Sequence, residues 1–259
     1  EGGGGGETGD PKDAQKGVMD ELEGRSSYMK QVNADRATFG PMIQDLAPQI
    51  EAFRPQETKQ VEAFVAEVDR RLGRLSDERM VLKGFASWPE KKLEMLREVA
   101  ARTAELHKLR ASIDPESDSW SGKNSIGEEL QQVIDKFDAY QPAVEWYLRS
   151  ADDLRRQYSQ YQIPFEFSLL KDLTVASVAL AKYAMTMVLT AYDRLKELQE
   201  QGDPRAPKAQ VEGLLQQGLK FSFRCHQFAG GFDDEANGLF ARVHDALSDV
   251  IALNHQLDE

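Results

Sequence analysis

The chain has 259 residues, of which 41% are hydrophobic and 29% are charged, and its formal net charge is −12. This length is enough for one large domain or two small ones whose core needs no covalent staples. The single cysteine excludes a disulfide within the chain and favours a reducing compartment. The acidic balance argues against a nonspecific nucleic-acid binder.

The N-terminal part of the sequence predicts a tail followed by a helical arm. Residues 1–10 are glycine-rich and have almost nothing to bury, so we expect a disordered tail. A helix is predicted from Pro11 to about Thr38, where Gly40–Pro41 should end it, and a short helix follows. The sparse apolar stripe of residues 11–54 is typical of an arm that needs a partner surface. We treat 11–259 as one helical domain that includes this arm.

The next segment predicts two long helices joined as a hairpin. Val61, Val68, Leu75 and Leu82 recur every seven residues, which predicts a helix from Pro55 to about residue 85. An antiparallel partner within the chain is favoured over an extended coiled coil. Trp88–Pro89 separates this helix from one that reaches residue 113, since proline suits a first helical turn.

The second half of the sequence predicts four more helices. One apolar phase continues from Ile126 to Tyr161 across Pro142 and indicates a single helix of about 35 residues. Helices over 173–198, over the stretch around residue 218 and from about Asp234 follow. The stretch around residue 218 is apolar on two faces, which predicts a central helix packed on several sides. Gly230–Gly231 should end it.

No stretch longer than four residues alternates as a strand should. The predicted fold is therefore all-α, an elongated multi-helix bundle of about seven or eight helices. The segment from Leu173 to Tyr192 has the length of a membrane span, but Lys182 lies near its centre, where insertion would cost about 3 kcal/mol. A buried core helix is the favoured interpretation.

Catalytic chemistry has no positive support in the sequence. No two of the four histidines have metal-ligand spacing and Cys225 has no cysteine partner, so we expect no metal, no cofactor and no enzyme. Cys225 and His226 are adjacent in a helix and point about 100° apart, which prevents a nucleophile–base pair. Both are interpreted as interior residues.

Partner surfaces are the remaining candidates, because large aromatic residues and arginine are typical interface anchors. Ordinary packing or solvated charge is the alternative for each candidate. The candidates comprise a basic and aromatic corner, a polar stripe on the helix around residue 218 and the glycine turn after it: Trp88, Lys91 and Lys92; Lys220, Arg224 and Gln227; and Phe232.

Two blocks of sequence resemble a plant family. Residues 218–233 read G-L-K-F-S-F-R-C-H-Q-F-A-G-G-F-D, and residues 77–92 read D-E-R-M-V-L-K-G-F-A-S-W-P-E-K-K. Both resemble the C-terminal region of the chloroplast unusual positioning proteins of plants. A weaker block covers Tyr161–Pro164 and Val178–Lys182.

The resemblance implies a fold similar to the all-helical actin-assembly domain of formins. It also implies binding to actin, promotion of actin polymerisation and a homodimer. From the acidic charge and from Lys182 in the apolar segment we expect no nucleic-acid binding and no membrane contact by this segment. The full-length proteins of this family act at the cytosolic face of the chloroplast outer envelope. Profilin is a family partner through a proline-rich part outside this chain.

Two hypotheses from different classes therefore remain open. In the first, the chain binds and assembles actin for chloroplast movement without a chemical step. In the second, it is a helical dimerisation scaffold that recruits cytoskeletal or signalling proteins without nucleating actin.

Overall fold

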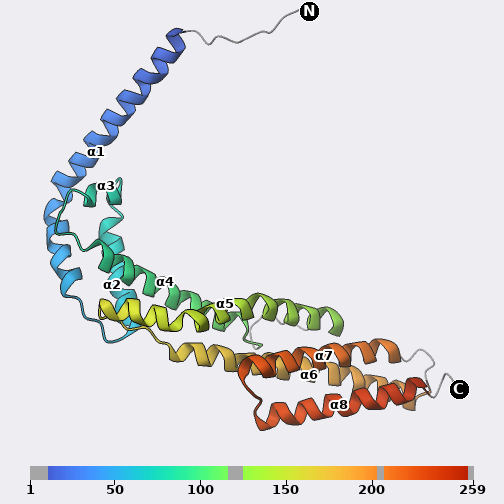
Figure 1. Ribbon diagram of the computed structural model, residues 1–259. Helices are drawn as coiled ribbons and strands as arrows, with labels where there is room; N and C mark the ends of the chain where they lie inside the picture. The colour runs from blue at the N-terminus through green and yellow to red at the C-terminus, as the bar shows by residue number, and fades with distance from the viewer. Residues whose placement is uncertain (1–10, 116–124, 203–206, 256–259) are drawn as a thin grey trace, which may run out of the picture. The chain divides into compact units, whose positions relative to one another are not determined.

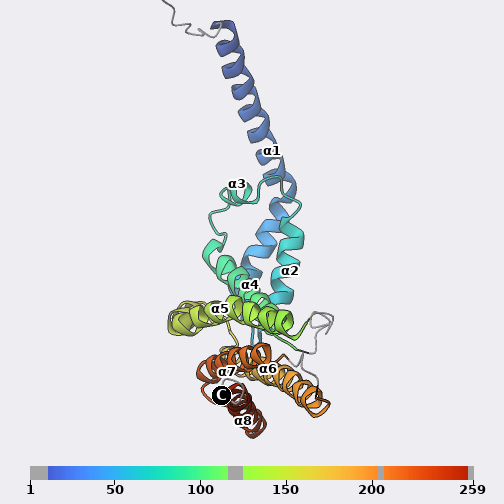
Figure 2. The same cartoon turned by 90° about the vertical axis from the view of Figure 1, so that its right-hand side faces the viewer.

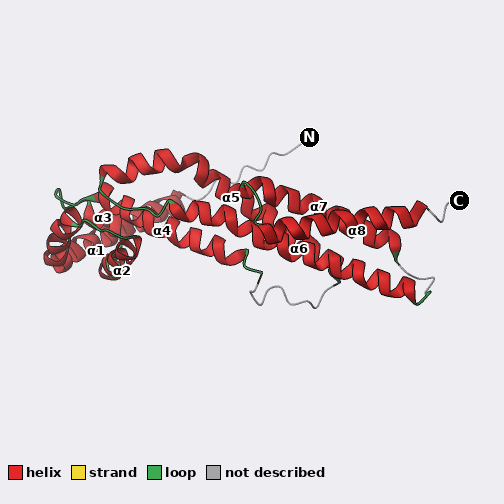
Figure 3. Cartoon of the chain, turned by 90° about the horizontal axis from the view of Figure 1, so that it is seen from below, coloured by secondary structure: helices red, strands yellow, loops and turns green. Residues whose placement is uncertain are grey.

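The computed structural model describes residues 11–115, 125–202 and 207–255, so the predicted tail at 1–10 lies outside the described residues. Every regular element in these ranges is a helix, as Figure 3 shows. The helices are α1 (Pro11–Ala52), α2 (Thr58–Leu72), α3 (Glu78–Leu82), α4 (Glu90–Ser112), α5 (Ile126–Gln160), α6 (Ser168–Glu200), α7 (Lys208–Ala229) and α8 (Asp234–His255). The all-α prediction is confirmed.

The chain divides into two compact units. Unit 1 contains the described residues up to Ala100 together with Gln160–Pro164. Unit 2 contains the described parts of 101–159 and of the chain from Phe165 onward. In unit 1, α1 runs beside α2 and α3 and its N-terminal half extends beyond them (Figure 1). In unit 2, α6, α7 and α8 lie side by side (Figure 2).

The predicted break at Gly40–Pro41 is wrong, because α1 continues through both Pro41 and Pro48 to Ala52. A proline removes one helical hydrogen bond and normally bends or ends a helix. Here Val32 before Pro41, Ile43 between the two prolines and Ile50 after Pro48 are all fully buried. The burial of this face keeps the helix in one phase across the prolines.

The predicted long helix from Pro55 to residue 85 is also wrong. α2 ends at Leu72, and α3 is a separate five-residue helix. Asp77 has an extended backbone and its side chain accepts a hydrogen bond from the N–H of Met80, 2.8 Å away. An aspartate in this geometry caps a new helix and is incompatible with a continuous one.

Hydrogen bonds join α3 and the turn before it to α1. Asp35 is 6% exposed, and its Oδ2 accepts from the backbone N–H and the hydroxyl of Ser76 at 2.7 and 2.6 Å. The hydroxyl of Tyr28 donates to Asp77 Oδ2 at 2.7 Å. Arg36 donates from Nε to the carbonyl of Val81 at 3.2 Å. These bonds set the position of α3 against α1.

The Asp35→Asn variant should be less stable than the wild type at neutral pH. Hydrogen bonds from the hydroxyl and the backbone N–H of Ser76 hold the pKa of Asp35 below its usual 3.8. The carboxylate therefore contributes stability above pH 3.8 that is lost as the pH falls through the lowered pKa. Urea midpoints should differ at pH 7, and the difference should shrink as the pH falls below 3.8, while Asp20→Asn on the exposed part of α1 should match the wild type throughout. A constant difference at all pH values would contradict this origin.

The core of unit 2 forms around α6, which packs against α7 and α8. Gly218 of α7 and Val188 of α6 are buried where the two helices approach closely. Lys182 of α6 binds Asp233 Oδ2 at 2.8 Å and also pairs with Glu235, so the turn between α7 and α8 is held against α6. The prediction of a core helix here is confirmed by the fourteen buried residues of α6.

Within the described ranges, α6 is the one helix long and apolar enough to cross a membrane by length and composition. Of its most apolar window, 56% is buried inside the structure. Packing against α7 and α8 accounts for the buried part of this window.

The end of α7 agrees with the predicted glycine stop. Gly230 has a φ of 76° and Gly231 a φ of 140°, values that favour glycine, and the N–H of Gly231 donates to the carbonyl of His226 at 3.0 Å. Asp233 then accepts from the N–H of Ala236 at 2.8 Å and begins α8.

Candidate functional site

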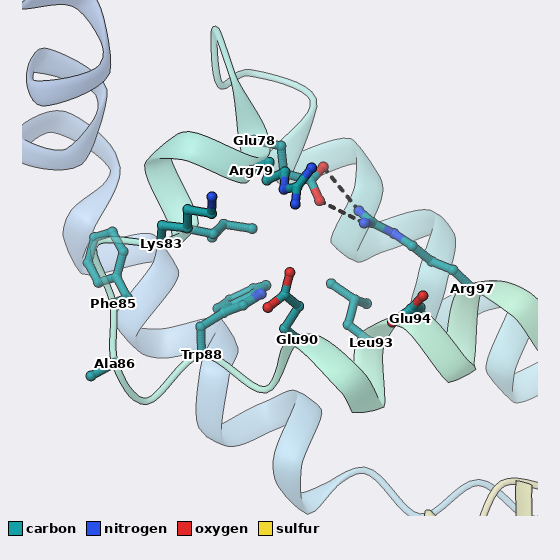
Figure 4. Close-up of a pocket in the computed structure, with 11 residues that line it drawn as sticks. Glu78, Arg79, Lys83, Phe85, Ala86, Trp88, Glu90, Leu93, Glu94 and Arg97 are labelled. Carbon is teal, nitrogen blue, oxygen red and sulfur yellow. Dashed lines mark hydrogen bonds and ion pairs between the residues drawn. The ribbon is translucent and has the colours of Figure 1, made fainter. Parts of the chain in front are cut away.

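A hollow of 630 Å³ opens in unit 1 between α3 and the start of α4 (Figure 4). Its lining combines apolar side chains with charges of both signs. The apolar residues are Leu82, Phe85, Ala86, Trp88 and Leu93, the basic residues are Arg79, Lys83 and Arg97, and the acidic residues are Glu78, Glu90 and Glu94.

The hollow is built almost entirely from one of the two sequence blocks noted above. All the lining residues except Leu93, Glu94 and Arg97 fall within residues 77–92. Three local features of the chain make this possible: Asp77 caps the start of α3, turns follow Leu82, and Pro89 precedes α4. Most of the block thus forms an open surface feature. Its buried residues are Val81, Leu82 and the polar residue Lys92.

One charged network forms a wall of the hollow. Arg97 of α4 donates to Glu78 Oε1 at 2.6 Å and to Asp69 Oδ1 of α2 at 2.8 Å. The two carboxylates neutralise this guanidinium and connect α2, α3 and α4. Figure 4 shows Arg79 reaching toward the hollow from α3, with Trp88 and Glu90 on the opposite side.

The two neighbouring lysines of the predicted basic corner occupy different environments. Lys91 is exposed, whereas Lys92 is only 4% exposed. The ammonium of Lys92 donates to the carbonyls of Glu51 and Phe53 at 2.7 and 2.8 Å. It therefore caps the C-terminal end of α1, and burial lowers the pKa of the Lys92 ammonium. This gives Lys92 a structural role that the sequence prediction did not include.

The polar stripe predicted on α7 is exposed at Lys220, Arg224 and Gln227. Arg224 pairs with Asp138 of α5, and its guanidinium lies 5.3 Å from the ring centre of Phe137. The stripe is therefore accessible at all three positions, although its arginine already joins α7 to α5. Its role as a partner surface stays a prediction.

The second apolar face of α7 is only partly covered, which corrects the expectation of a helix that is buried nearly all round. Phe223 is 51% exposed, while Phe221 and Cys225 on the neighbouring face are buried. The ring centre of Phe232 lies 5.0 Å from the ring centre of His226 and 6.1 Å from that of Phe240. The predicted partner residue Phe232 thus packs in a partly exposed aromatic row between α7 and α8.

The described residues contain no group of three or more histidine, cysteine, aspartate and glutamate side chains that could hold a metal ion. Burial raises the pKa of the Cys225 thiol to about 12, so the thiolate needed for nucleophilic attack is scarce at neutral pH. What the site offers is an aromatic and charged surface, which suits binding.

Trp88 could be singled out from the sequence, but the charged residues that share its hollow could not. Arg79, Glu94 and Arg97 come from two helices, and no spacing rule reveals that α3 lies near enough to α4 for Glu78 to pair with Arg97. A signal for Lys92 was present, because Lys92, Leu96 and Val99 share one helical phase at i, i+4 and i+7. That phase places Lys92 on the buried side of α4.

Residues 96–257 match the protein family described as "IPGAL1-like, C-terminal domain". The chain belongs to this family. An uncharacterized protein of Arabidopsis thaliana is 27% identical over 242 residues, which cover 92% of this chain and 33% of that relative. The chain therefore spans about a third of the length of this relative. Both findings agree with a plant protein family.

Proposed function

We propose that the chain is a non-catalytic helical domain that binds actin and promotes filament assembly in a protein that positions chloroplasts. The observation that carries the proposal is the folding of residues 77–92, which resemble the chloroplast positioning proteins, into the open hollow around Trp88. A core segment would resemble its relatives for packing reasons alone. An open hollow lined by tryptophan and unpaired charges has the composition of a binding surface.

The exposed part of α1 supports a homodimer. Leu22, Met29, Ile43 and Ile50 share one heptad phase, and the last two are fully buried in unit 1. Leu22 and Met29 are 57% and 37% exposed, so the stripe continues beyond its partner helices. A second copy of the chain could cover it. Two copies would then hold two actin subunits in filament-like register and lower the free energy of the nucleus.

The proposal places the full-length protein at the cytosolic face of the chloroplast outer envelope. Profilin would act mainly through regions outside this chain. These features rest on the resemblance of residues 77–92 and 218–233 to the chloroplast positioning proteins.

The second candidate function is a dimerisation scaffold without actin nucleation. The exposed stripe of α1 favours the scaffold as strongly as it favours actin assembly, because the stripe explains dimerisation and a scaffold requires no actin contact. The net charge of −12 also favours it, since actin is itself acidic.

Polymerisation of fluorescently labelled actin, with and without profilin, distinguishes the two functions. The wild-type chain should shorten the lag in a dose-dependent way. Trp88→Ala should require at least about tenfold more protein for the same lag, because truncating an interface anchor costs about 2 kcal/mol or more. Trp146→Ala removes a tryptophan that is 42% exposed on α5 of unit 2, and it should behave as the wild type.

An unchanged lag at micromolar protein with full helicity would move the assignment to the scaffold. Light scattering on the same sample would then show whether the chain is a dimer. If Trp88→Ala and Trp146→Ala both shorten the lag as much as the wild type does, the hollow is not the surface that binds actin.

A further inference from the structure

We infer that the Trp88 hollow binds a short helical segment of a protein partner that presents an apolar side chain between an acidic and a basic one. This inference deepens the proposed function and rests on its premise that the hollow is a binding surface. It specifies the chemistry of the occupant, which the resemblance to the chloroplast positioning proteins does not provide.

Some of the charged side chains that line the hollow form ion pairs within the protein, and others do not. Arg97 is neutralised by Glu78 and Asp69. Glu90 and Glu94 form no ion pair with any described residue, and they lie four residues apart on the same face of α4. Like charges at this spacing repel each other on a helix, and a cation between them would relieve the repulsion.

The α3 side of the hollow carries a positive charge, opposite in sign to Glu90 and Glu94. Arg79 extends from α3 toward the hollow in Figure 4 and has no ion pair within the described ranges, although Asp77 is close enough to interact with it electrostatically. The hollow therefore has a basic wall on α3 and an acidic wall on α4. An occupant that satisfies both walls needs one charge of each sign.

The apolar part of the lining comprises Trp88 and Leu93, with Leu82, Phe85 and Ala86, and Trp88 lies beside Glu90 across the hollow from Arg79 (Figure 4). This apolar surface favours an aliphatic side chain, and the face of Trp88 also attracts the cation beside it. A volume of 630 Å³ accommodates a few side chains. A helix places acidic, apolar and basic side chains on one face at i−4, i and i+4, so a short helical segment can present all three kinds of side chain to the hollow at once.

The probe is a fluorescein-labelled, end-capped helical peptide of about 15 residues, long enough for partial helicity in water. It carries Glu, Leu and Lys at i−4, i and i+4 on an otherwise Ala-Gln face. Anisotropy titration against the full chain should show saturable binding. A peptide with Gln at both charged positions should bind at least about fivefold more weakly, as expected for losing two exposed ion pairs.

A reciprocal charge exchange tests the orientation of the walls. The double variant Glu90→Lys with Glu94→Lys should bind the probe at least about fivefold more weakly, and a peptide with Glu in place of its Lys should recover the affinity for this variant. The double variant Asp193→Lys with Glu197→Lys makes the same change in net charge at two exposed positions, also four residues apart, on α6 of unit 2. It should bind the original probe as the wild type does.

Equal binding of the charged and Gln peptides, or failure of the exchanged peptide to recover affinity, would overturn the inference. The outcome is separable from actin assembly. Peptide binding with no effect on the actin lag would support the hollow and reject the actin function. Trp88-dependent actin assembly without charge-dependent peptide binding would do the reverse.

Discussion

Replacing Gly218 with valine should lower the free energy of unfolding by about 3 kcal/mol, the upper end of the usual cost of overpacking a core. A β-carbon at this position would lie 2.9 Å from Cγ1 and 3.1 Å from Cγ2 of Val188. Both residues are buried where α6 and α7 cross, so neither helix can retreat without opening the core of unit 2. Urea denaturation followed by circular dichroism measures the change.

Two further variants identify the cause of the loss. Gly213 lies in the same helix, and a β-carbon added there would meet no atom within 4 Å, so Gly213→Ala should stabilise the chain by up to about 1 kcal/mol through helix propensity. Val188→Ala in the Gly218→Val background should recover part of the stability, giving a strongly non-additive pair. Additive losses would show that the close approach of the two helices is not the source of the effect.

Replacing Lys92 with methionine should destabilise unit 1 by about 1.5 kcal/mol, the lower end of the range for hydrogen bonds from a charged donor. Methionine preserves the aliphatic stem but removes the ammonium that donates to the carbonyls of Glu51 and Phe53 at 2.7 and 2.8 Å, and these carbonyls keep the bonds from Arg54 Nη1 at 2.6 and 2.9 Å. The measured quantity is the urea midpoint of the full chain.

Lys91→Met is the matched control, because its side chain is the exposed neighbour on the same turn. Its stability should lie within about 0.5 kcal/mol of the wild type, as for most surface substitutions. If Lys92→Met were as stable as the wild type and yet failed to bind a partner, Lys92 would belong to the binding surface, as expected from the sequence. The pair of variants therefore separates capping from recognition.

Periodicity predicted the later helices well and the first three poorly. The start of α4 after Pro89 and the single long α5 followed from apolar phase and proline position. The same reasoning failed at Pro41, where burial of the α1 face overrides the local preference of proline to end a helix. It also failed near Asp77, because the heptad phase of Leu75 and Leu82 continues across a turn that ends one helix and begins another.

The candidate site could be predicted only as far as its anchor. Trp88 beside Pro89 marks a helix boundary and an aromatic surface in any all-α fold. The facing of Arg79 against Glu90 depends on how α3 turns back toward α4, and that geometry is set by tertiary hydrogen bonds to α1 from residues more than forty positions away. Local pattern contains no information about such bonds.

Tyr28 connects the exposed part of α1 to α3, which forms one wall of the Trp88 hollow. Its ring lies on the exposed part of α1, and its hydroxyl bonds to Asp77, the residue that caps α3. A partner that orders this part of α1 would also stabilise the α3 wall of the Trp88 hollow. Reciprocity then requires that a ligand in the hollow strengthen association along α1 by the same factor. Under the proposed function, association along α1 and binding in the hollow would thus be coupled through contacts that include the hydroxyl of Tyr28.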